Sequence, residues 1–206
     1  MKTRSDLHLA RKLWHIFGVL TIVALYLSVS RPQALQLAVL GAFLAVTVDV
    51  LRQQWASLNS MMIRLFKPVM RSQEQLGYAG ISYLMVGVLI LVALFPTPIV
   101  ILSLLFLAIA DPLASYVGIL YGKDKLIGRK SLQGTIAAFL ACTLIAALFF
   151  YFNGLMIERL LIVSFLAGLI GAFAELLPIG KLDDNLTLPL VSASLLWILF
   201  FLFGGF

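Results

Sequence analysis

The sequence has few charged residues and only one cysteine. Charged side chains make up 12% of its 206 residues, whereas 62% of the residues are hydrophobic and the mean hydropathy is +1.07. A soluble globular domain of this length needs much more polar surface, so the composition excludes that class. Cys142 cannot form a disulfide within the chain, and we interpret it as a small packing residue.

Long apolar runs replace the missing polar surface. A helix needs about 20 apolar residues to cross a hydrocarbon core about 30 Å thick. Seven runs approach this length: 13–30, 33–51, 77–95, 97–121, 132–152, 157–177 and 186–203. We therefore predict an all-α polytopic membrane protein with about seven spans, forming one integral membrane domain over residues 1–206.

The formal net charge of +6 is distributed in a way that predicts orientation rather than nucleic-acid binding. Alternate loops are basic: Lys2, Arg4, Arg11 and Lys12 precede the first span, Arg52, Arg64, Lys67 and Arg71 follow the second, Lys123, Lys125, Arg129 and Lys130 follow the fourth, and Lys181 follows the sixth. The other loops carry only Arg31 and Arg159. Because cytoplasmic loops are enriched in Lys and Arg, we expect a multi-pass cell-membrane protein whose N-terminus is cytoplasmic and whose C-terminus is outside.

The first apolar run also resembles a signal peptide with a small-x-small cleavage site at 28–30. However, Trp14 and His15 lie inside what would be the apolar core of that peptide, and Arg31-Pro32 would follow the cut directly. We therefore favour a retained first span.

The segment 52–76 is amphipathic. Trp55, Met61, Leu65 and other apolar residues recur at helical spacing among several basic residues. This pattern is typical of a helix that lies in the headgroup layer, so we predict a cytoplasmic anchoring segment without chemistry of its own.

A carboxylate interrupts the fourth apolar run at Asp111, directly before Pro112. An ionisable group at the centre of a span costs about 2.5 to 3.5 kcal/mol, which makes Asp111 a candidate for function. Aspartate suits a helix N-cap and proline suits the first helical position, so the pair predicts a broken span with a half-helix over 112–121. The alternative is a proline kink in which a neighbouring backbone group satisfies Asp111.

Small residues at every fourth position allow close helix packing there: Ala114, Gly118 and Gly122.

The basic loop 122–131 is suited to phosphate. Glycine lets backbone amides approach an anion, and lysine and arginine neutralise it. Ser131 can cap the fifth span, so that the amides of its first turn point to the same place. The spacing is not that of a Walker A loop, and a basic loop alone more often only sets membrane topology.

Carboxylates that topology does not require also lie near the cytoplasmic ends of the spans: Asp49, Glu175, Asp183 and Asp184. Small residues before Glu175 would turn it into the bundle. Asp183-Asp184-Asn185, followed by Thr187 and Pro189, predicts an unwound start of the seventh span. Magnesium bound with nucleotide phosphates takes one or two protein carboxylates, which this cluster can supply.

Weaker candidates occur near the ends of the first two spans. Arg11 and His15 share one helix face beside Lys12, and Asp49 and Arg52 are three residues apart. Such groups are usually snorkelling side chains or local ion pairs, and the same applies to one further residue, Glu74.

Three motifs carry a resemblance to a known family. They are D-x-x-A-x-x-x-G-x-x-x-G from Asp111 to Gly122, K-S-L-x-G from Lys130 to Gly134, and E-x-x-P…D-N-x-T-x-P from Glu175 to Pro189. Weaker matches are R-K-x-x-H at Arg11 to His15, and Asp49 with Arg52. With these motifs the chain resembles, over nearly its whole length, the CTP-dependent lipid-alcohol kinases: dolichol kinase, phytol kinase and CTP-dependent diacylglycerol kinase. One departure is Gln133, where we expect family members often to carry glutamate.

The resemblance implies transfer of the γ-phosphoryl group of CTP to the hydroxyl of a polyprenol, a phytol-like isoprenoid or diacylglycerol, with Mg²⁺, at the cytoplasmic face. We expect the catalytic residues to be Asp111, Lys130, Glu175 and Asp184, and Asp111 either orients the lipid hydroxyl or acts as base. The nucleotide would contact Gly118, Gly122, Lys123, Lys130, Ser131 and Gly134, and magnesium would bind Glu175, Asp184 and Asn185. Accessory candidates are Arg11, Lys12, His15, Asp49, Arg52 and Glu74.

Two other functions fit parts of the pattern. A phosphatidate cytidylyltransferase also uses CTP, but we would expect an aspartate-rich signature with basic residues near its C-terminus, where this chain has only Asp183-Asp184-Asn185. A transporter or lipid-binding protein could use the broken fourth span as an ion site, but no second interrupted span occurs in a repeated position. Neither the lipid alcohol nor the oligomeric state follows from the sequence.

Overall fold

The computed structural model describes residues 9–206. Within this range, the apolar runs form helices. Lys2 and Arg4 of the predicted charge pattern lie outside this range. The α-helices are α1 Leu9–Ser28, α2 Arg31–Gln54, α3 Ala56–Phe66, α4 Gly80–Leu94, α5 Thr97–Leu105, α6 Asp111–Leu120, α7 Leu132–Phe152, α8 Leu160–Leu176 and α9 Asp184–Phe203. The other elements are 3-10 turns at Ser72–Gln75 and Ile157–Arg159, a π-helical segment at Phe106–Ala110, and strands β1 Lys125–Ile127 and β2 Lys130–Ser131.

Within these residues, six helices are long and apolar enough to cross a membrane: Leu9–Ser28, Arg31–Gln54, Thr97–Leu120, Leu132–Phe152, Ile157–Leu176 and Asp184–Phe203. Each corresponds to a predicted span, which confirms the all-α polytopic bundle. The remaining predicted span, 77–95, is the shorter apolar helix α4. Its 15 residues measure about 22 Å at 1.5 Å per residue, less than the thickness of a typical hydrocarbon core.

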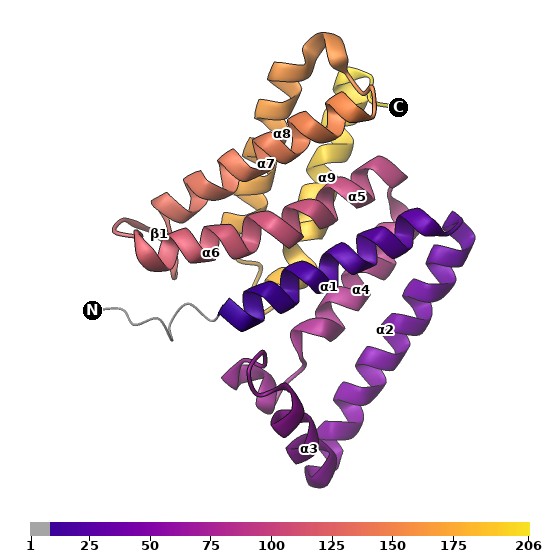
Figure 1. Cartoon of the computed structure of the whole chain (residues 1–206), viewed down its shortest axis with the longest axis vertical. Coiled ribbons are helices and arrows are strands. Elements are labelled where there is room, and N and C mark those ends of the chain that lie inside the picture. Colours follow the sequence, from indigo (N-terminus) through magenta and orange to yellow (C-terminus); the bar gives the residue numbers. More distant parts are fainter. Residues whose placement is uncertain (1–8) are drawn as a thin grey trace.

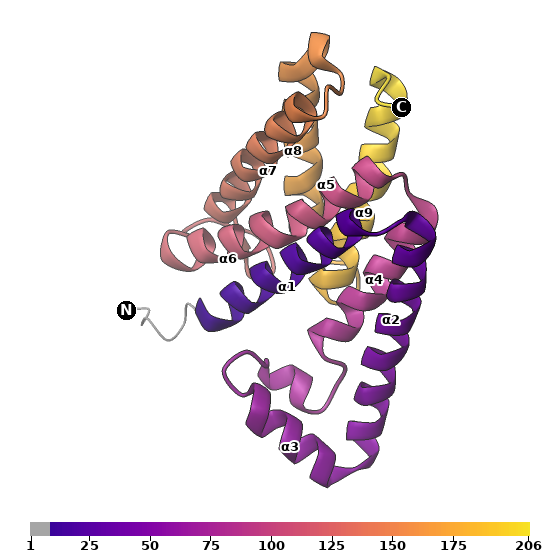
Figure 2. The ribbon, with the colours of Figure 1, turned by 45° about the vertical axis from the view of Figure 1, so that its right-hand side comes forward.

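Successive long helices run in opposite directions, so the bundle has two distinct ends (Figures 1 and 2). One end holds α3 together with the starts of α1, α4, α7 and α9, and we call it the α3 end. The turn between α7 and α8 and the C-terminus lie at the opposite end. The basic loops of the sequence therefore gather at the α3 end.

The fourth span is continuous, so the prediction of a broken span is wrong. Asp111 has helical dihedral angles (φ −60°, ψ −52°) and is not a cap, and the residue before α6, Ala110, is helical as well. A proline ring inside a helix clashes with the carbonyl one turn earlier. We attribute the continuity to the wider π turn at Phe106–Ala110, which gives the ring of Pro112 room without unwinding the chain.

The predicted small-residue ridge on α6 packs against the start of α7. A Cβ atom on Gly122 would lie 2.6 Å from Ser131 Oγ, and a Cβ atom on Gly134 would lie 2.7 Å from the carbonyl oxygen of Ala114. Ser131 caps α7 as predicted, because its hydroxyl accepts a 3.2 Å hydrogen bond from Gly134 N–H. The glycines therefore fix where β2 and α7 begin relative to α6.

The segment 52–76 is helical over a shorter range than predicted. Arg52 belongs to α2, Trp55 is extended, and only the 11 residues of α3 form an α-helix. None of the α3 side chains is buried, which agrees with an interfacial position. Phe66 contacts the first span, since its ring lies edge-on to that of Trp14 with centroids 6.4 Å apart.

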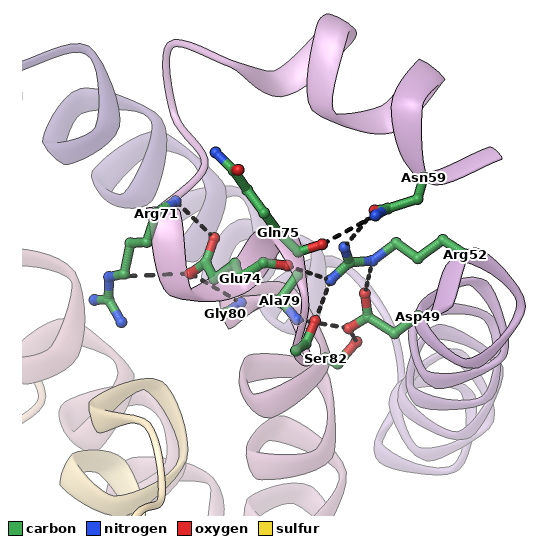
Figure 3. A network of polar contacts seen from close by, with 10 residues as sticks. Asp49, Arg52, Asn59, Arg71, Glu74, Gln75, Ala79, Gly80 and Ser82 are labelled. Carbon is green, nitrogen blue, oxygen red and sulfur yellow. Dashed lines mark hydrogen bonds and ion pairs between the residues drawn. The ribbon is translucent and has the colours of Figure 1, made fainter. Parts of the chain in front are cut away.

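A buried ion pair fixes the rest of this segment to the bundle (Figure 3). Asp49 and Arg52 are 3% and 2% exposed, and Arg52 Nε lies 2.5 Å from Asp49 Oδ1. Of the two roles considered for this pair, the ion pair is confirmed. The other carboxylate oxygen of Asp49 accepts hydrogen bonds from Ala79 N–H at 2.7 Å and from Ser82 Oγ at 2.5 Å.

Arg52 completes the network with donors to three further groups. It donates to the carbonyl oxygens of Glu74, at 2.8 Å, and Gly77, and to Asn59 Oδ1 at 3.1 Å. Because these partners lie in α3, in residues 74–77 and next to α4, one arginine joins α2 to the whole segment (Figure 3).

The last span starts earlier than predicted. Residues 177–183 are non-helical, but α9 begins at Asp184, and Asp183 caps it by accepting a 3.0 Å hydrogen bond from Asn185 N–H. The predicted unwound stretch up to Pro189 is therefore wrong, since that proline lies inside α9. The Asp183 cap therefore starts the helix at Asp184, before the position 186 that the sequence predicted.

Replacing Arg52 by methionine should destabilise the protein by roughly 3 to 5 kcal/mol, because Asp49 would be left buried without its counter-ion. Arg64→Met is the matched control: Arg64 is exposed on α3, so we expect a change within about 0.5 kcal/mol. Unfolding in detergent micelles measures both. Equal effects of the two substitutions would contradict the role given to the network.

Gly134→Ala should separate α6 from α7, because the new Cβ would lie 2.7 Å from a backbone oxygen. We expect a loss of roughly 1 to 3 kcal/mol, as for other overpacked contacts. Gly18→Ala is the control, because no atom lies within 4 Å of its Cβ position in α1. That change should be neutral or stabilising by up to about 1 kcal/mol. If Gly134→Ala were as well tolerated, the close approach of α6 and α7 would not be required.

Candidate active site

Three charged side chains from separate elements meet at the α3 end of the bundle. Lys130 of β2 places its Nζ 3.5 Å from Glu175 Oε1, at the end of α8, and 3.3 Å from Asp184 Oδ2, at the start of α9. The ammonium also donates to the backbone carbonyl of Glu175. Glu175 is 6% exposed, whereas Lys130 and Asp184 are only partly buried. The structure thus brings together three of the four residues expected to be catalytic.

Small residues place Glu175 there. A Cβ atom on Gly171 would lie 2.3 Å from Cys142 Sγ, so α8 can approach α7 only where these positions are small. Cys142 is fully buried in this contact, which confirms its packing role. Glu175 follows Gly171 by one helical turn and therefore lies on the same side of α8, next to α7.

One oxygen of Glu175 has no partner. Within residues 9–206, Glu175 Oε2 is buried and accepts no hydrogen bond, and the same is true of Thr135 Oγ1 in the first turn of α7. Thr135 lies two turns before Cys142 on α7, and Glu175 lies one turn after Gly171 on α8, so both are displaced from the Gly171–Cys142 contact toward the α3 end. Buried polar atoms are nearly always paired, so the unpaired carboxylate oxygen of Glu175 is an available ligand atom; the third such atom among the described residues, Ser164 Oγ, is a hydroxyl nearer the start of α8.

Asn185 lies beside the carboxylates in sequence but binds elsewhere. Its amide Nδ2 donates a 3.1 Å hydrogen bond to the carbonyl of Gly80 in α4, whereas Asp184 contacts Lys130. Among the residues that the structure describes, no three His, Cys, Asp or Glu side chains gather as a metal site. Glu175 and Asp184 remain as two carboxylates on one lysine, which is enough for magnesium when phosphate oxygens complete the shell.

Asp111 is half-buried in the fourth span and makes no hydrogen bond or ion pair with the residues that the structure describes. Its charge acts on Arg11 and Lys12 of α1 and also on Glu175 and Asp184. The alternative in which a neighbouring backbone group satisfies Asp111 is therefore not what the structure shows. Instead, this carboxylate interacts electrostatically with the basic start of α1 and with two members of the Lys130 cluster, which consists of Lys130, Glu175 and Asp184.

The first span approaches Asp111 more closely than the sequence indicates. Lys12 is only 7% exposed and donates a 2.5 Å hydrogen bond to Ser115 Oγ, one turn after Asp111 on α6. Lys12 therefore is not a snorkelling side chain on the bundle surface.

Arg71 is only a topology determinant in the sequence pattern, yet it contacts the start of α9. The guanidinium of Arg71 donates to Asp183, and its Nε lies 3.9 Å from Glu74 Oε1. The backbone N–H of Arg71 donates to Glu74 Oε2 at 3.1 Å. Burial lowers the pKa of Arg71, but the two carboxylates outweigh it and raise the pKa above its ordinary value. The spacing of Arg71 and Glu74 was the available sequence signal.

The remaining predicted nucleotide contacts occupy structural positions. Gly118, Gly122 and Gly134 lie in the packing between α6 and α7, and Ser131 is the cap of α7. Lys123 is exposed, and its N–H donates to Gln133 Oε1 at 3.1 Å. Contacts of these residues with a nucleotide remain predictions.

Gln133 holds the β1–β2 hairpin to α7. Besides accepting from Lys123, it donates from Nε2 to Asp124 Oδ2 at 2.8 Å. A glutamate here would place a second carboxylate against Asp124. The glutamine is therefore matched to the loop of this chain.

Comparison with known proteins places the chain in a family. No protein-family model and no solved structure matches it. It is 35% identical over 170 residues to CTP-dependent diacylglycerol kinase 1 of Schizosaccharomyces pombe, which covers 78% of each protein. It is 30% identical to an uncharacterized protein of Rickettsia prowazekii over 92% of this chain and 94% of the other. The CTP-dependent diacylglycerol kinase 1 of Saccharomyces cerevisiae is 25% identical over 89% of this chain and 70% of its own length. With the S. pombe similarity extending over most of both proteins, the chain belongs to the CTP-dependent lipid kinases, as its motifs predicted.

Proposed function

We propose that this chain transfers the γ-phosphoryl group of CTP to the hydroxyl of diacylglycerol at the α3 end of the bundle. The observation that carries the proposal is the contact of Lys130 with Glu175 and Asp184, beside a buried carboxylate oxygen that has no partner among the described residues. The names of the relatives favour diacylglycerol over a polyprenol or phytol-like acceptor and favour a kinase over a cytidylyltransferase or a transporter.

Phosphoryl transfer depends on position and charge neutralisation more than on covalent chemistry. Lys130 carries one positive charge between two carboxylates, so it can exchange a carboxylate for a phosphate oxygen without leaving the cluster. Glu175 and Asp184 are the residues that would hold Mg²⁺, with Glu175 Oε2 as the available ligand. When bound, the ion would neutralise charge that develops on the phosphates.

Asp111 is suited to the lipid hydroxyl. It has no partner among the described residues, and it is only half-buried in a predominantly apolar span. In the proposed reaction, a diacylglycerol in the bilayer would bring its hydroxyl to the partly exposed carboxylate. In that position Asp111 would orient the hydroxyl or accept its proton.

We further propose that the α3 end faces the cytoplasm in the cell membrane. The basic residues of loops 52–76 and 122–131 support this orientation, since cytoplasmic loops are enriched in Lys and Arg. CTP would then reach the Lys130 cluster directly from the compartment in which nucleotides are made.

Purified protein with CTP and Mg²⁺ should phosphorylate diacylglycerol and release CDP. We expect Lys130→Met to lower kcat/KM by roughly 100-fold or more, because a preorganised charge at the transferring phosphoryl group is lost. The assay should include ATP as donor and isoprenoid alcohols as acceptors.

Lys67→Met is the matched control, because Lys67 is exposed at the end of α3 and makes no hydrogen bond or ion pair with another described residue. It should keep wild-type activity. Release of pyrophosphate instead of CDP would point to a cytidylyltransferase, and absence of any labelled lipid phosphate would reject the proposed function.

Orientation can be tested by single-cysteine labelling in a Cys142→Ala background. Arg129→Cys places a thiol in the β1–β2 hairpin, and Asn153→Cys places one in the turn between α7 and α8. A membrane-impermeant maleimide should label the thiol at position 153 in intact cells and the thiol at position 129 only after permeabilisation. The reverse pattern would place the site on the outer face.

A further inference from the structure

The fourth span contains a backbone oxygen that its own helix cannot satisfy. The π segment Phe106–Ala110 ends directly before Asp111, and the next residue is Pro112. In a π turn the donor for a carbonyl lies five residues further along, which for Leu107 is Pro112. Proline has no N–H, so Leu107 needs a donor from another helix.

His15 of α1 supplies that donor. Its Nε2 lies 3.0 Å from the carbonyl oxygen of Leu107, across a separation of 92 residues. Because a carbonyl can only accept, the bond requires a proton on Nε2 of His15. His15 is half-buried, so the bond is partly shielded from water.

A second bond joins the same two helices on the other side of Asp111. Lys12 of α1 donates to Ser115 of α6 at 2.5 Å. Asp111 and Ser115 are four residues apart on α6 and therefore share a face, which is the face toward α1. Leu107 precedes Asp111 by one turn, so Asp111 lies between the two contacts with α1.

The direction in which Asp111 points depends on the π turn. Each residue of an α-helix rotates the next by about 100°. A π turn contains about one residue more than an α turn. If it relaxed to a regular α turn, α6 would therefore rotate by about 100° relative to α5. Asp111 would then no longer face the start of α1 and the Lys130 cluster.

We propose that His15 is a positioning residue: by satisfying the Leu107 carbonyl it holds the π turn, and thereby aims Asp111 at the reacting lipid hydroxyl. This inference rests on the proposed function. It differs from a general packing role, because the effect of His15 should exist only while residue 112 lacks an N–H.

Four variants test this: His15→Ala, His15→Gln, Pro112→Ala and the double variant His15→Ala/Pro112→Ala. His15→Ala should lower kcat by about tenfold to a hundredfold, as expected for a misplaced reacting group, with KM for CTP within about twofold. His15→Gln retains an N–H donor and should recover most of the activity. In the double variant the alanine at position 112 can donate within the helix, so loss of His15 should cost no more than about twofold beyond Pro112→Ala alone.

Thr21→Ala is the control on the same helix, because among residues 9–206 the Thr21 hydroxyl bonds only to the Phe17 carbonyl in its own turn, and the change should leave kcat unchanged. If His15→Ala lowers the unfolding midpoint but not kcat, or if the losses of His15→Ala and Pro112→Ala multiply, the inference is wrong. Should His15→Ala not fold, His15→Gln and the double variant still decide the outcome.

Failure of the proposed function gives a different result. In that case wild-type protein shows no CTP-dependent lipid phosphorylation at all, and the same four variants are compared by unfolding midpoint alone. A midpoint loss in His15→Ala that disappears in the Pro112→Ala background would still support the His15–Leu107 contact. Additive losses would reject it independently of the reaction.

Discussion

A charge or backbone polar group inside a membrane must find a partner within the protein, and most of this structure follows from how those partners are found. Unpaired polar groups cost several kcal/mol in hydrocarbon. Lys12 therefore bonds to Ser115, His15 to the Leu107 carbonyl, and Arg31 to the carbonyls of Val92 and Phe95. Because each of these contacts joins different helices, pairing the polar groups also fixes how the helices pack.

The same constraint separates a structural network from a functional one. Both oxygens of Asp49 accept hydrogen bonds, and Arg52 donates to a side chain and two backbone carbonyls as well as to Asp49. A fully satisfied network is rigid and has no capacity for a ligand. Around Lys130, by contrast, Glu175 Oε2 has no partner among the described residues. The unsatisfied carboxylate oxygen distinguishes the Lys130 cluster, where we propose that substrate binds, from the Asp49–Arg52 network, which holds helices together.

The sequence predicted those features that depend on residues close together in the chain. The spans follow from hydropathy, the α6 ridge from Ala114, Gly118 and Gly122 at every fourth residue, and the cap of α7 from Ser131. The fourth span was mispredicted because Asp-Pro is compatible with both a helix start and a π turn. The choice depends on His15, 92 residues away. Thr135 and Arg71 were missed for the same reason, since their significance arises only from the helices that surround them.

The charge of the Lys130 cluster also bears on the order of binding. One ammonium faces two carboxylates, so with both carboxylates ionised the cluster attracts a cation and repels the triphosphate of free CTP. In the proposed reaction, a divalent ion bound to the two carboxylates would reverse that sign and release Lys130 toward the phosphates. In the proposed reaction, the cluster should therefore bind the divalent ion before or together with CTP. Asp111 makes no ion pair with Lys130, so in the proposed reaction its carboxylate is available for the lipid hydroxyl.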